Sequence, residues 1–253
     1  LEIDVPVCLG ASQPIIKEVE VCAAIHGETG LDGFEFPELI KKYDTRHAVN
    51  FIVETILSSK EKVTMVTTGP MTNLALAIRV NPDIINNIEE VVLMGGSYQN
   101  GNVTPAAEFN IYCDPEAADI VFKSGLKTTM VGLDVTRKVL CYEHIIDRMA
   151  KINNKASDLF DKLMRVFNEN QKRVFGFEGS PLHDPVTIAY LMDPSLLEVK
   201  YVNCEIDISQ GSSYGRTNCD IFGYLGYPNN TYVAVGIDVD KFWDIIEESI
   251  KRY

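Results

Sequence analysis

The sequence predicts an α/β fold: a mostly parallel, Rossmann-like sheet with flanking helices and a small antiparallel addition. In the first half, short apolar runs rich in β-branched residues alternate with segments of helical spacing. Such alternation favours parallel strands joined by right-handed crossovers. The chain has 253 residues, of which 46% are hydrophobic, and no Pro/Gly/Ser-rich linker divides it. We therefore expect a single domain over residues 1–253.

Turn and helix-capping residues mark the boundaries of the elements in the first half of the chain. The predicted strands cover residues 5–9, 63–67, 91–94 and 128–133. The predicted helices cover residues 45–58, a segment around 74–78, and residues 114–124. Thr45 is the expected cap of the first helix. Asp114 is the expected cap of the third, with Pro115 at its first position.

The second half changes character. Residues 142–192 are mostly helical in pattern, with a break near 176–181. Three strand-like segments follow at residues 199–208, 215–219 and 231–237, and we predict that they form the antiparallel addition. An amphipathic helix over residues 238–250 closes the chain.

Composition excludes several classes of partner. The net charge of −13 argues against binding to a nucleic-acid backbone or an anionic membrane, because both require basic surface. No apolar run approaches the roughly 18 residues of a membrane span, and the first residues lack the pattern of a signal peptide. A neutral small molecule is compatible with this charge.

Cysteine spacing indicates the redox compartment. None of the six cysteines forms a CxxC pair, which argues against a thiolate metal site or a disulfide framework. Buried reduced thiols in a cytoplasmic protein are the expected state. The six are Cys8, Cys22, Cys113, Cys141, Cys204 and Cys219.

Residues 91–118 carry the strongest functional signal. A buried strand breaks at Gly95-Gly96 and enters a polar loop that contains Asn102, Glu108 and Asn110. Ligands bind at the carboxyl ends of strands in α/β proteins, and amides with a carboxylate suit a polyhydroxylated ligand such as a sugar. A loop that only faces water is the alternative. The glycine pair belongs to no phosphate-binding motif, so we expect no nucleotide phosphate here.

Three further positions carry weaker signals. Asp184, after His183, stands before an apolar helix and is either a helix cap or a carboxylate ligand of a hard cation such as Ca²⁺. Thr68 follows a strand, and an ordinary strand-to-helix turn is the favoured interpretation there. His26 lies in a glycine-rich stretch that indicates a shaped loop, where a lone histidine is more often structural or solvated.

Ordered motifs resemble a known family over nearly the whole chain. They are HGETGLDG, TTGPMTN, VVLMGG, GNVTPAAEFNIYCDPEAA, GLDVT, HDP and the pair Phe242-Trp243. Together they resemble the calcium-dependent, inosine-uridine preferring nucleoside hydrolases, and within these the pyrimidine-specific ribonucleoside hydrolases. The resemblance implies hydrolysis of the N-glycosidic bond of uridine or cytidine to ribose and free base. It also implies a Ca²⁺ cofactor, a homo-oligomer (dimer or tetramer), and a role in pyrimidine salvage in the cytoplasm.

The resemblance also assigns roles to residues. His183 and Asn110 are the expected catalytic residues: His183 assists the leaving base, and Asn110 lies near the developing cation. The Thr68 carbonyl and the Asp184 carboxylate are the expected ligands of Ca²⁺. The expected substrate-binding residues are His26, Met94, Asn102, Glu108, Asn110, Gln171, Phe175 and His183. Within this set, Asn102 and Glu108 would hold the 5′ side of the ribose.

Two departures from the family pattern qualify this expectation. The aspartate-rich pattern D-x-D-P-G-x-D-D, which carries metal ligands in the family, does not occur in the sequence. We therefore expect an N-terminally truncated chain without the first strand unit, and a catalytically impaired or non-catalytic nucleoside-binding homologue or subunit is the alternative. Phe175 stands where the pyrimidine-specific enzymes have Tyr, which leaves the base preference open.

Overall fold

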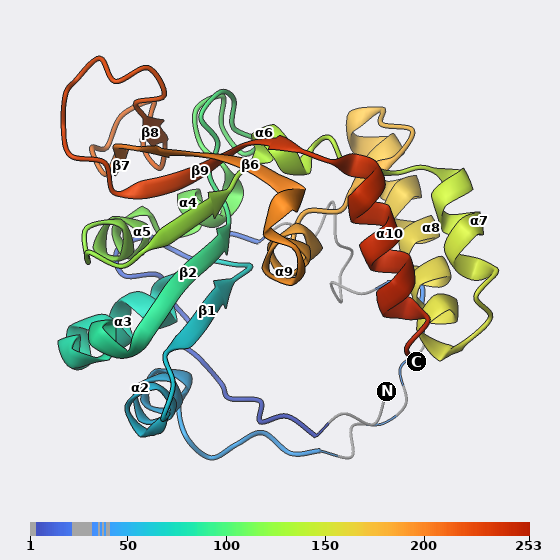
Figure 1. The fold of residues 1–253 in the computed structure, drawn as a ribbon, viewed down its shortest axis with the longest axis horizontal. Coiled ribbons are helices and arrows are strands. Elements are labelled where there is room, and N and C mark those ends of the chain that lie inside the picture. The colour runs from blue at the N-terminus through green and yellow to red at the C-terminus, as the bar shows by residue number, and fades with distance from the viewer. Residues whose placement is uncertain (1–3, 22–31, 35, 37, 39–40) are drawn as a thin grey trace.

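The computed structural model describes residues 4–21, 32–34, 36, 38 and 41–253. Its main sheet has the strand order β1-β2-β3-β9-β6. The first four strands run parallel, and β6 at the edge runs antiparallel to β9. Figure 1 shows this sheet with helices on both of its faces. The predicted α/β class, mostly parallel with a small antiparallel addition, is confirmed.

The elements have the following bounds. The strands are β1 (Val63–Thr67), β2 (Ile88–Met94), β3 (Thr128–Val131), β4 (Leu140–Cys141), β5 (Ser180–Pro181), β6 (Leu197–Val202), β7 (Cys204–Ile206), β8 (Thr217–Cys219) and β9 (Thr231–Ile237). The helices are α2 (Ala48–Ser58), α3 (Thr72–Val80), α4 (Phe109–Cys113), α5 (Pro115–Phe122), α6 (Leu133–Thr136), α7 (Glu143–Ala150), α8 (Lys155–Phe175), α9 (Pro185–Met192) and α10 (Val239–Ile250). Two 3₁₀ turns, η1 (Pro82–Asn87) and η2 (Pro194–Leu196), precede β2 and β6.

Strand β2 explains why the sheet needs helices on both sides. Successive side chains of a strand point to opposite faces. Val91 and Leu93 belong to the core cluster beneath α2, α3 and α5, whereas Val92 belongs to the cluster beneath α6, α9 and α10. All three are at most 1% exposed. A continuous apolar run is therefore what a parallel strand buried on both faces requires.

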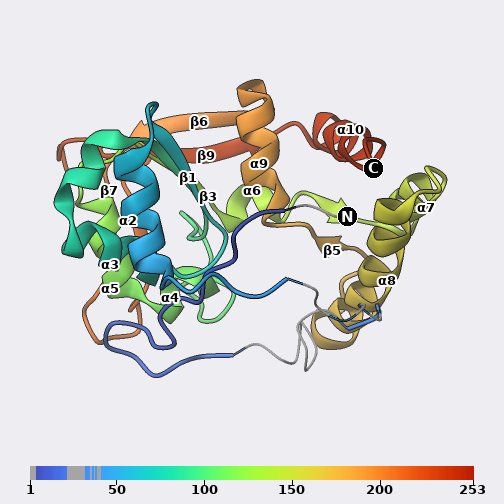
Figure 2. The ribbon, with the colours of Figure 1, turned by 90° about the horizontal axis from the view of Figure 1, so that it is seen from below.

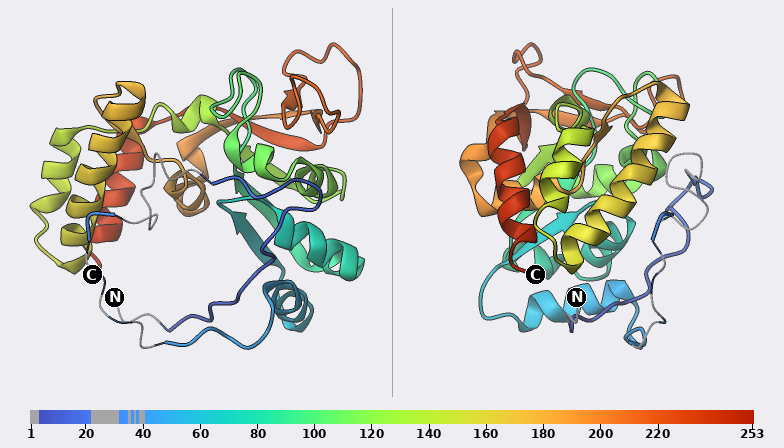
Figure 3. Two further views of the ribbon diagram at one scale, coloured as in Figure 1. Left: turned by 180° about the vertical axis from the view of Figure 1, so that it is seen from behind. Right: turned by 90° about the vertical axis from the view of Figure 1, so that its right-hand side faces the viewer.

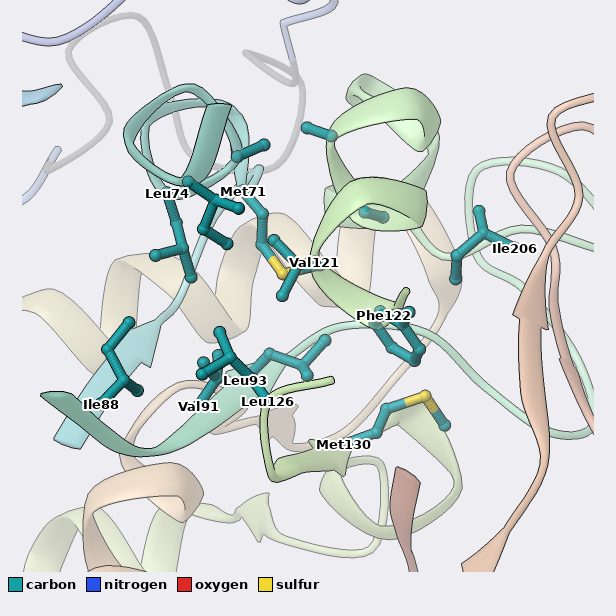
Figure 4. Close-up of a cluster of buried hydrophobic side chains, with 14 of the residues drawn as sticks. Met71, Leu74, Ile88, Val91, Leu93, Val121, Phe122, Leu126, Met130 and Ile206 are labelled. Atoms are coloured by element: carbon teal, nitrogen blue, oxygen red, sulfur yellow. The ribbon is translucent and has the colours of Figure 1, made fainter. Parts of the chain in front are cut away.

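The two cores are built differently. Figure 4 shows the first, where Leu74 of α3 and Val121 and Phe122 of α5 converge on β2. The second lies toward the long helix α8, and Figure 3 shows α7, α8 and α10 grouped together beside the sheet. Full burial of one such side chain contributes about 1.5–3 kcal/mol. None of the described helices combines the length and the apolar composition that a membrane span requires.

Several predicted elements need correction. Residues 5–9 form no strand; Cys8 makes only an isolated bridge to Asp44. Helix α2 is capped by His47, whose ring accepts from the Val49 N–H, and not by Thr45. Strand β9 matches its predicted residues, but it pairs in parallel with β3 inside the main sheet. An apolar run alone does not reveal whether a strand pairs in parallel or antiparallel, because this depends on the partner strand.

Candidate active site

A single cavity of about 820 Å³ collects the predicted site residues. It lies where β1 and β2 end, and α8 and the start of α9 supply its other wall. Figure 2 shows α9 between the strands and the α7–α8 pair. The predicted residues that line the cavity are Thr68, Met94, Asn102, Glu108, Asn110, Gln171, Phe175, His183 and Asp184. His26 lies outside the described residues.

Glu108 anchors the polar loop from within. Its Oε1 accepts the Asn110 N–H at 2.9 Å, and its Oε2 accepts the Gly96 and Ile111 N–H groups at 3.0 and 3.1 Å. The carboxylate therefore caps α4 and ties it to the glycine pair after β2. Burial raises the pKa of Glu108 to about 7, although the three N–H groups act in the opposite direction. Oε2 therefore uses both of its lone pairs, whereas Oε1 keeps one lone pair for a ligand.

The raised pKa of Glu108 predicts a pH dependence of stability. Because the folded-state pKa of about 7 lies above the ordinary 4.5, the native state holds this proton more tightly than the unfolded chain. The stabilisation is complete below about pH 4.5 and is lost as the pH rises through 7, for a total of about 3 kcal/mol. Denaturant unfolding of the wild type and Glu108→Gln from pH 4.5 to 8 measures it. A difference between the two proteins that stays constant with pH contradicts the prediction.

The two loop amides are oriented by the backbone. Asn102 Oδ1 accepts the Phe109 N–H at 2.9 Å, so its amide nitrogen is the group that it offers to a ligand. Asn110 is reversed: its Nδ2 donates to the carbonyls of Met94 and Thr68, at 3.1 and 3.4 Å. Asn110 therefore offers its amide oxygen to the cavity. The cavity thus receives a donor from one amide and an acceptor from the other.

Helix α6 holds the same loop from outside. Asp134 accepts the Ser97 hydroxyl at 3.1 Å and the Tyr98 N–H at 2.8 Å. Arg137, just after the helix, donates to the carbonyls of Asn100 and Gly101 at 3.2 and 2.7 Å. Sequence reasoning gave these residues no role. The GLDVT motif contains Asp134, so the motif was the available signal for it.

His183 is held by a buried threonine. Its Nδ1 lies 2.7 Å from Oγ1 of Thr136, which is fully buried at the end of α6. The contact fixes the ring plane, and with it the direction of the opposite nitrogen, Nε2. Thr136 is the last residue of the GLDVT motif, and sequence reasoning did not assign it a function.

Thr136→Val tests this contact, because valine keeps the shape and removes the hydroxyl. We expect kcat/KM for a nucleoside to fall by about 5–10-fold, the worth of one hydrogen bond, with a change in the pH profile of kcat/KM. Thr136→Ser is the matched control that keeps the hydroxyl. Equal activity of the valine and serine variants would remove Thr136 from the account.

Asp184 occupies a cap position without acting as a cap. Its backbone is already helical, with φ −63° and ψ −41°, and its side chain makes no capping hydrogen bond. The capping interpretation is therefore wrong for this residue. The carboxylate opens to the cavity, and desolvation by the surrounding protein raises its pKa to about 6. A carboxylate that is desolvated in this way favours a cation beside it.

The described residues fit a hard cation in the type of donor but not in number. Asp184 contributes a carboxylate and Thr68 a backbone carbonyl, which are the oxygen donors that Ca²⁺ prefers. Within the described part of the chain, no three His, Cys, Asp or Glu side chains gather as a metal-binding group. Ca²⁺ takes about six to eight oxygens. The described residues therefore supply only part of a ligand set.

The far end of the cavity is apolar with one buried amide. Gln171 on α8 is 5% exposed, and its side chain makes no hydrogen bond within the described residues. At the end of the same helix, Phe175 and Phe177 stack with ring centroids 5.6 Å apart. Gly176 between them has a φ of +74°, which turns the chain and brings the second ring beside the first. Sequence reasoning identified Phe175 but not Phe177.

Comparison with known proteins agrees with this geometry. The family model described as inosine-uridine preferring nucleoside hydrolase matches residues 1–244. The pyrimidine-specific ribonucleoside hydrolases RihB of Shigella flexneri and of Escherichia coli K12 are each 44% identical over 253 residues, covering all of this chain and 81% of the relative.

Solved structures give the same fold. A purine-preferring ribonucleoside hydrolase from Gardnerella vaginalis has a TM-score of 0.89 and 34% identity, covering 98% of this chain and 82% of that one. A plant nucleoside hydrolase, the PpNRh1 enzyme, also has a TM-score of 0.89, with 26% identity and coverage of 98% and 81%. Family and fold therefore agree along the chain. The protein belongs to the inosine-uridine preferring nucleoside hydrolase family, enzymes that hydrolyse the N-glycosidic bond of ribonucleosides.

Proposed function

We propose that the protein hydrolyses uridine and cytidine to ribose and the free pyrimidine. One observation carries this proposal: a single cavity joins the oriented amides of the polar loop to the apolar end with its buried glutamine. The first end suits a sugar and the second a base. Relatives named pyrimidine-specific are 44% identical to this chain, whereas the Gardnerella enzyme is named purine-preferring.

At the sugar end, the loop residues would grip a polyhydroxylated ring. The Asn102 amide nitrogen and the Glu108 carboxylate would hold the 5′ side of the ribose. Met94, which is 3% exposed at the end of β2, would pack on the apolar face of the sugar. The Asn110 amide oxygen would lie near the anomeric carbon. Because glycoside cleavage passes through an oxocarbenium-like transition state, a fixed partial negative charge there stabilises the reaction.

At the scissile bond, His183 would serve the leaving base. Its ring is fixed by Thr136, so its imidazole reaches the base in one orientation. An imidazole at this position can act as a general acid toward the departing base. Protonation of the departing pyrimidine lowers the barrier to cleavage because the base then leaves as a neutral molecule, and a hydrogen bond lowers it by stabilising the negative charge on the leaving base. His183 is therefore the proposed acid, and Asn110 the proposed stabiliser of the cation.

We propose Ca²⁺ as the cation beside Asp184. The Asp184 carboxylate and the Thr68 carbonyl would hold it, and ribose hydroxyls and water molecules are further oxygen donors of the kind it takes. The bound ion would orient the ribose hydroxyls and lower the pKa of a bound water. Asn110 also contributes here, since its Nδ2 bond at 3.4 Å fixes the Thr68 carbonyl.

Gln171 is the residue that we propose recognises the base by hydrogen bonding. A pyrimidine presents an edge of amide-like donors and acceptors, and a buried amide that makes no hydrogen bond to the described residues is complementary to it. We expect Gln171→Leu to raise KM for uridine by about tenfold, because one hydrogen-bonding partner is lost. KM for inosine should change less. Uridine and inosine kinetics of both proteins measure this, and an equal change for the two substrates would contradict the assignment.

Charge favours a neutral substrate. Among the described residues that line the cavity, the carboxylates are Glu20, Asp32, Glu108 and Asp184, and the cation is Arg137. Arg137 is already engaged by two loop carbonyls. A nucleoside therefore fits this cavity better than a phosphorylated nucleotide, whose anionic group would meet these carboxylates.

We also propose a cytoplasmic homo-oligomer, dimer or tetramer, acting in pyrimidine salvage. The loop after β8 exposes Phe222, Tyr224, Leu225 and Tyr227, each at more than half of its surface. Clustered exposed apolar side chains are typical of a contact surface. Light scattering coupled to size exclusion measures the mass of the particle. A monomer at micromolar concentration would overturn the oligomer proposal.

A further inference from the structure

Strands β7 and β8 bring two cysteines together that lie far apart in sequence. Cys204 and Cys219 are opposite each other in this antiparallel pair, and their Sγ atoms are 3.3 Å apart. Figure 1 places the pair at the edge of the molecule, beside the start of β9 and away from α7 and α8. Neither residue has a role in the proposed hydrolysis. Two thiols at this distance form a site for a covalent modification.

The backbone register suits a disulfide. Asp220 N–H donates to the Asn203 carbonyl on one side, and Asp207 N–H donates to the Arg216 carbonyl on the other. Hydrogen-bonded and non-hydrogen-bonded pairs alternate in an antiparallel ladder, so Cys204 and Cys219 form a non-hydrogen-bonded pair, with Cα atoms about 4.5 Å apart. Disulfides span Cα separations of roughly 4.4–6.8 Å. The bond can therefore form with little movement of the backbone.

The Asn230 side chain confirms this register. Its Oδ1 accepts the Cys204 N–H at 2.8 Å, and its Nδ2 donates to the Cys204 carbonyl at 2.9 Å. The main-chain groups of Cys204 are thus satisfied on the side away from β8. Formation of a disulfide would break none of these bonds.

We propose that Cys204 and Cys219 form a reversible disulfide by exchange with a low-molecular-weight disulfide such as oxidised glutathione. The Cys219 thiolate attacks one glutathione sulfur, a mixed disulfide forms, and one glutathione leaves. Cys204 then attacks Sγ of Cys219, and the second glutathione leaves with the proton of the Cys204 thiol. Two protein thiols are oxidised to one disulfide, and one glutathione disulfide is reduced to two thiols.

The exposure of the two thiols sets this order of events. Cys219 is partly exposed, whereas Cys204 is buried. The hydrogen bond with Cys219, together with burial, raises the pKa of Cys204 well above its ordinary value, so Cys204 is a poor first nucleophile. Once Cys219 carries glutathione, Cys204 is the thiol next to the mixed disulfide.

The disulfide would restrain a hairpin that supports the polar loop. Thr217 lies two residues before Cys219 on β8, so both side chains share one face. Thr217 Oγ1 accepts the Ser97 N–H at 2.9 Å and donates to the Ser97 carbonyl at 2.7 Å. Ser97 lies in the loop that carries Asn102 and Glu108. Oxidation would therefore stabilise the base of this loop from the far side of the cavity.

The test is thiol mapping of the whole protein after incubation with oxidised or reduced glutathione. Peptide mass spectrometry should find a Cys204–Cys219 cross-link in the oxidised protein and none in Cys219→Ser. Cys8→Ser is the matched control, because Cys8 is also partly exposed, and its cross-link should persist. Absence of the cross-link, or glutathione that stays on Cys219 without transfer to Cys204, would overturn the proposal.

Two further readouts test the effect on the loop. Oxidation should raise Tm by about 5 °C and slow hydrogen exchange at the Ser97 amide severalfold, and Cys219→Ser should abolish both changes. A cross-link that leaves the Ser97 exchange rate unchanged would refute the support of the loop. None of these measurements requires turnover of a nucleoside, so their outcome is independent of the proposed hydrolysis.

Discussion

Asp184→Asn should lower kcat/KM for uridine by about a thousandfold or more, with Ca²⁺ present. Asparagine keeps the size of the side chain and removes the negative charge that the proposed cation requires. The carboxylate caps no helix, so a loss of activity in this variant would not result from a destabilised helix α9. Steady-state release of ribose from uridine measures the effect.

The same substitution should leave the fold intact. The Asp184 side chain is exposed and makes no capping hydrogen bond, so a neutral amide of the same size should not disturb the packing around it. Tm should therefore stay close to the wild-type value. Asp158→Asn is the matched control, since Asp158 pairs with Lys162 on the surface of α8. Turnover by Asp184→Asn at the wild-type rate would remove Asp184 from the site.

Asn110→Ala should lower kcat for uridine by roughly 10²–10³-fold and change KM much less. The amide nitrogen is held by the carbonyls of Met94 and Thr68, so the oxygen is fixed in one direction before substrate arrives. A preorganised dipole acts on the charge that develops in the transition state, and its removal is expected to affect kcat.

Asn102→Ala is the comparison for this variant. Asn102 is proposed to hold the 5′ side of the ribose in the ground state and the transition state alike, so its loss should raise KM with little change in kcat. The two variants together separate binding from catalysis. An effect of Asn110→Ala on KM alone would contradict the proposed role of Asn110.

The fold was predictable where local pattern and burial agree. The predicted strands 63–67 and 231–237 match the observed strands to the residue, because a run of β-branched residues between two turns strongly favours a β-strand. The direction of β9 was not predictable, since it is decided by the partner strand β3. Residues 5–9 have a strand-like composition, but they bridge to Asp44 at only one point.

The candidate site was predictable from the motifs shared with the family, but not from composition and residue patterns alone. Residues 91–118 placed the polar loop at the end of a strand, and the structure confirms that position. The contacts of Thr136 with His183 and of Arg137 with the loop were not predictable, because they join segments 36–47 residues apart. Cys204 and Cys219 carry no motif, and only the pairing of β7 with β8 brings them together.

Ribose release from uridine in the presence of Ca²⁺ measures the proposed hydrolysis itself, with inosine assayed in parallel and Asp184→Asn as the inactive control. We expect release of ribose and uracil by the wild type, a higher kcat/KM for uridine than for inosine, and loss of both activities in the variant. Binding of uridine without release of ribose would contradict the proposed hydrolysis and favour a non-catalytic nucleoside-binding protein.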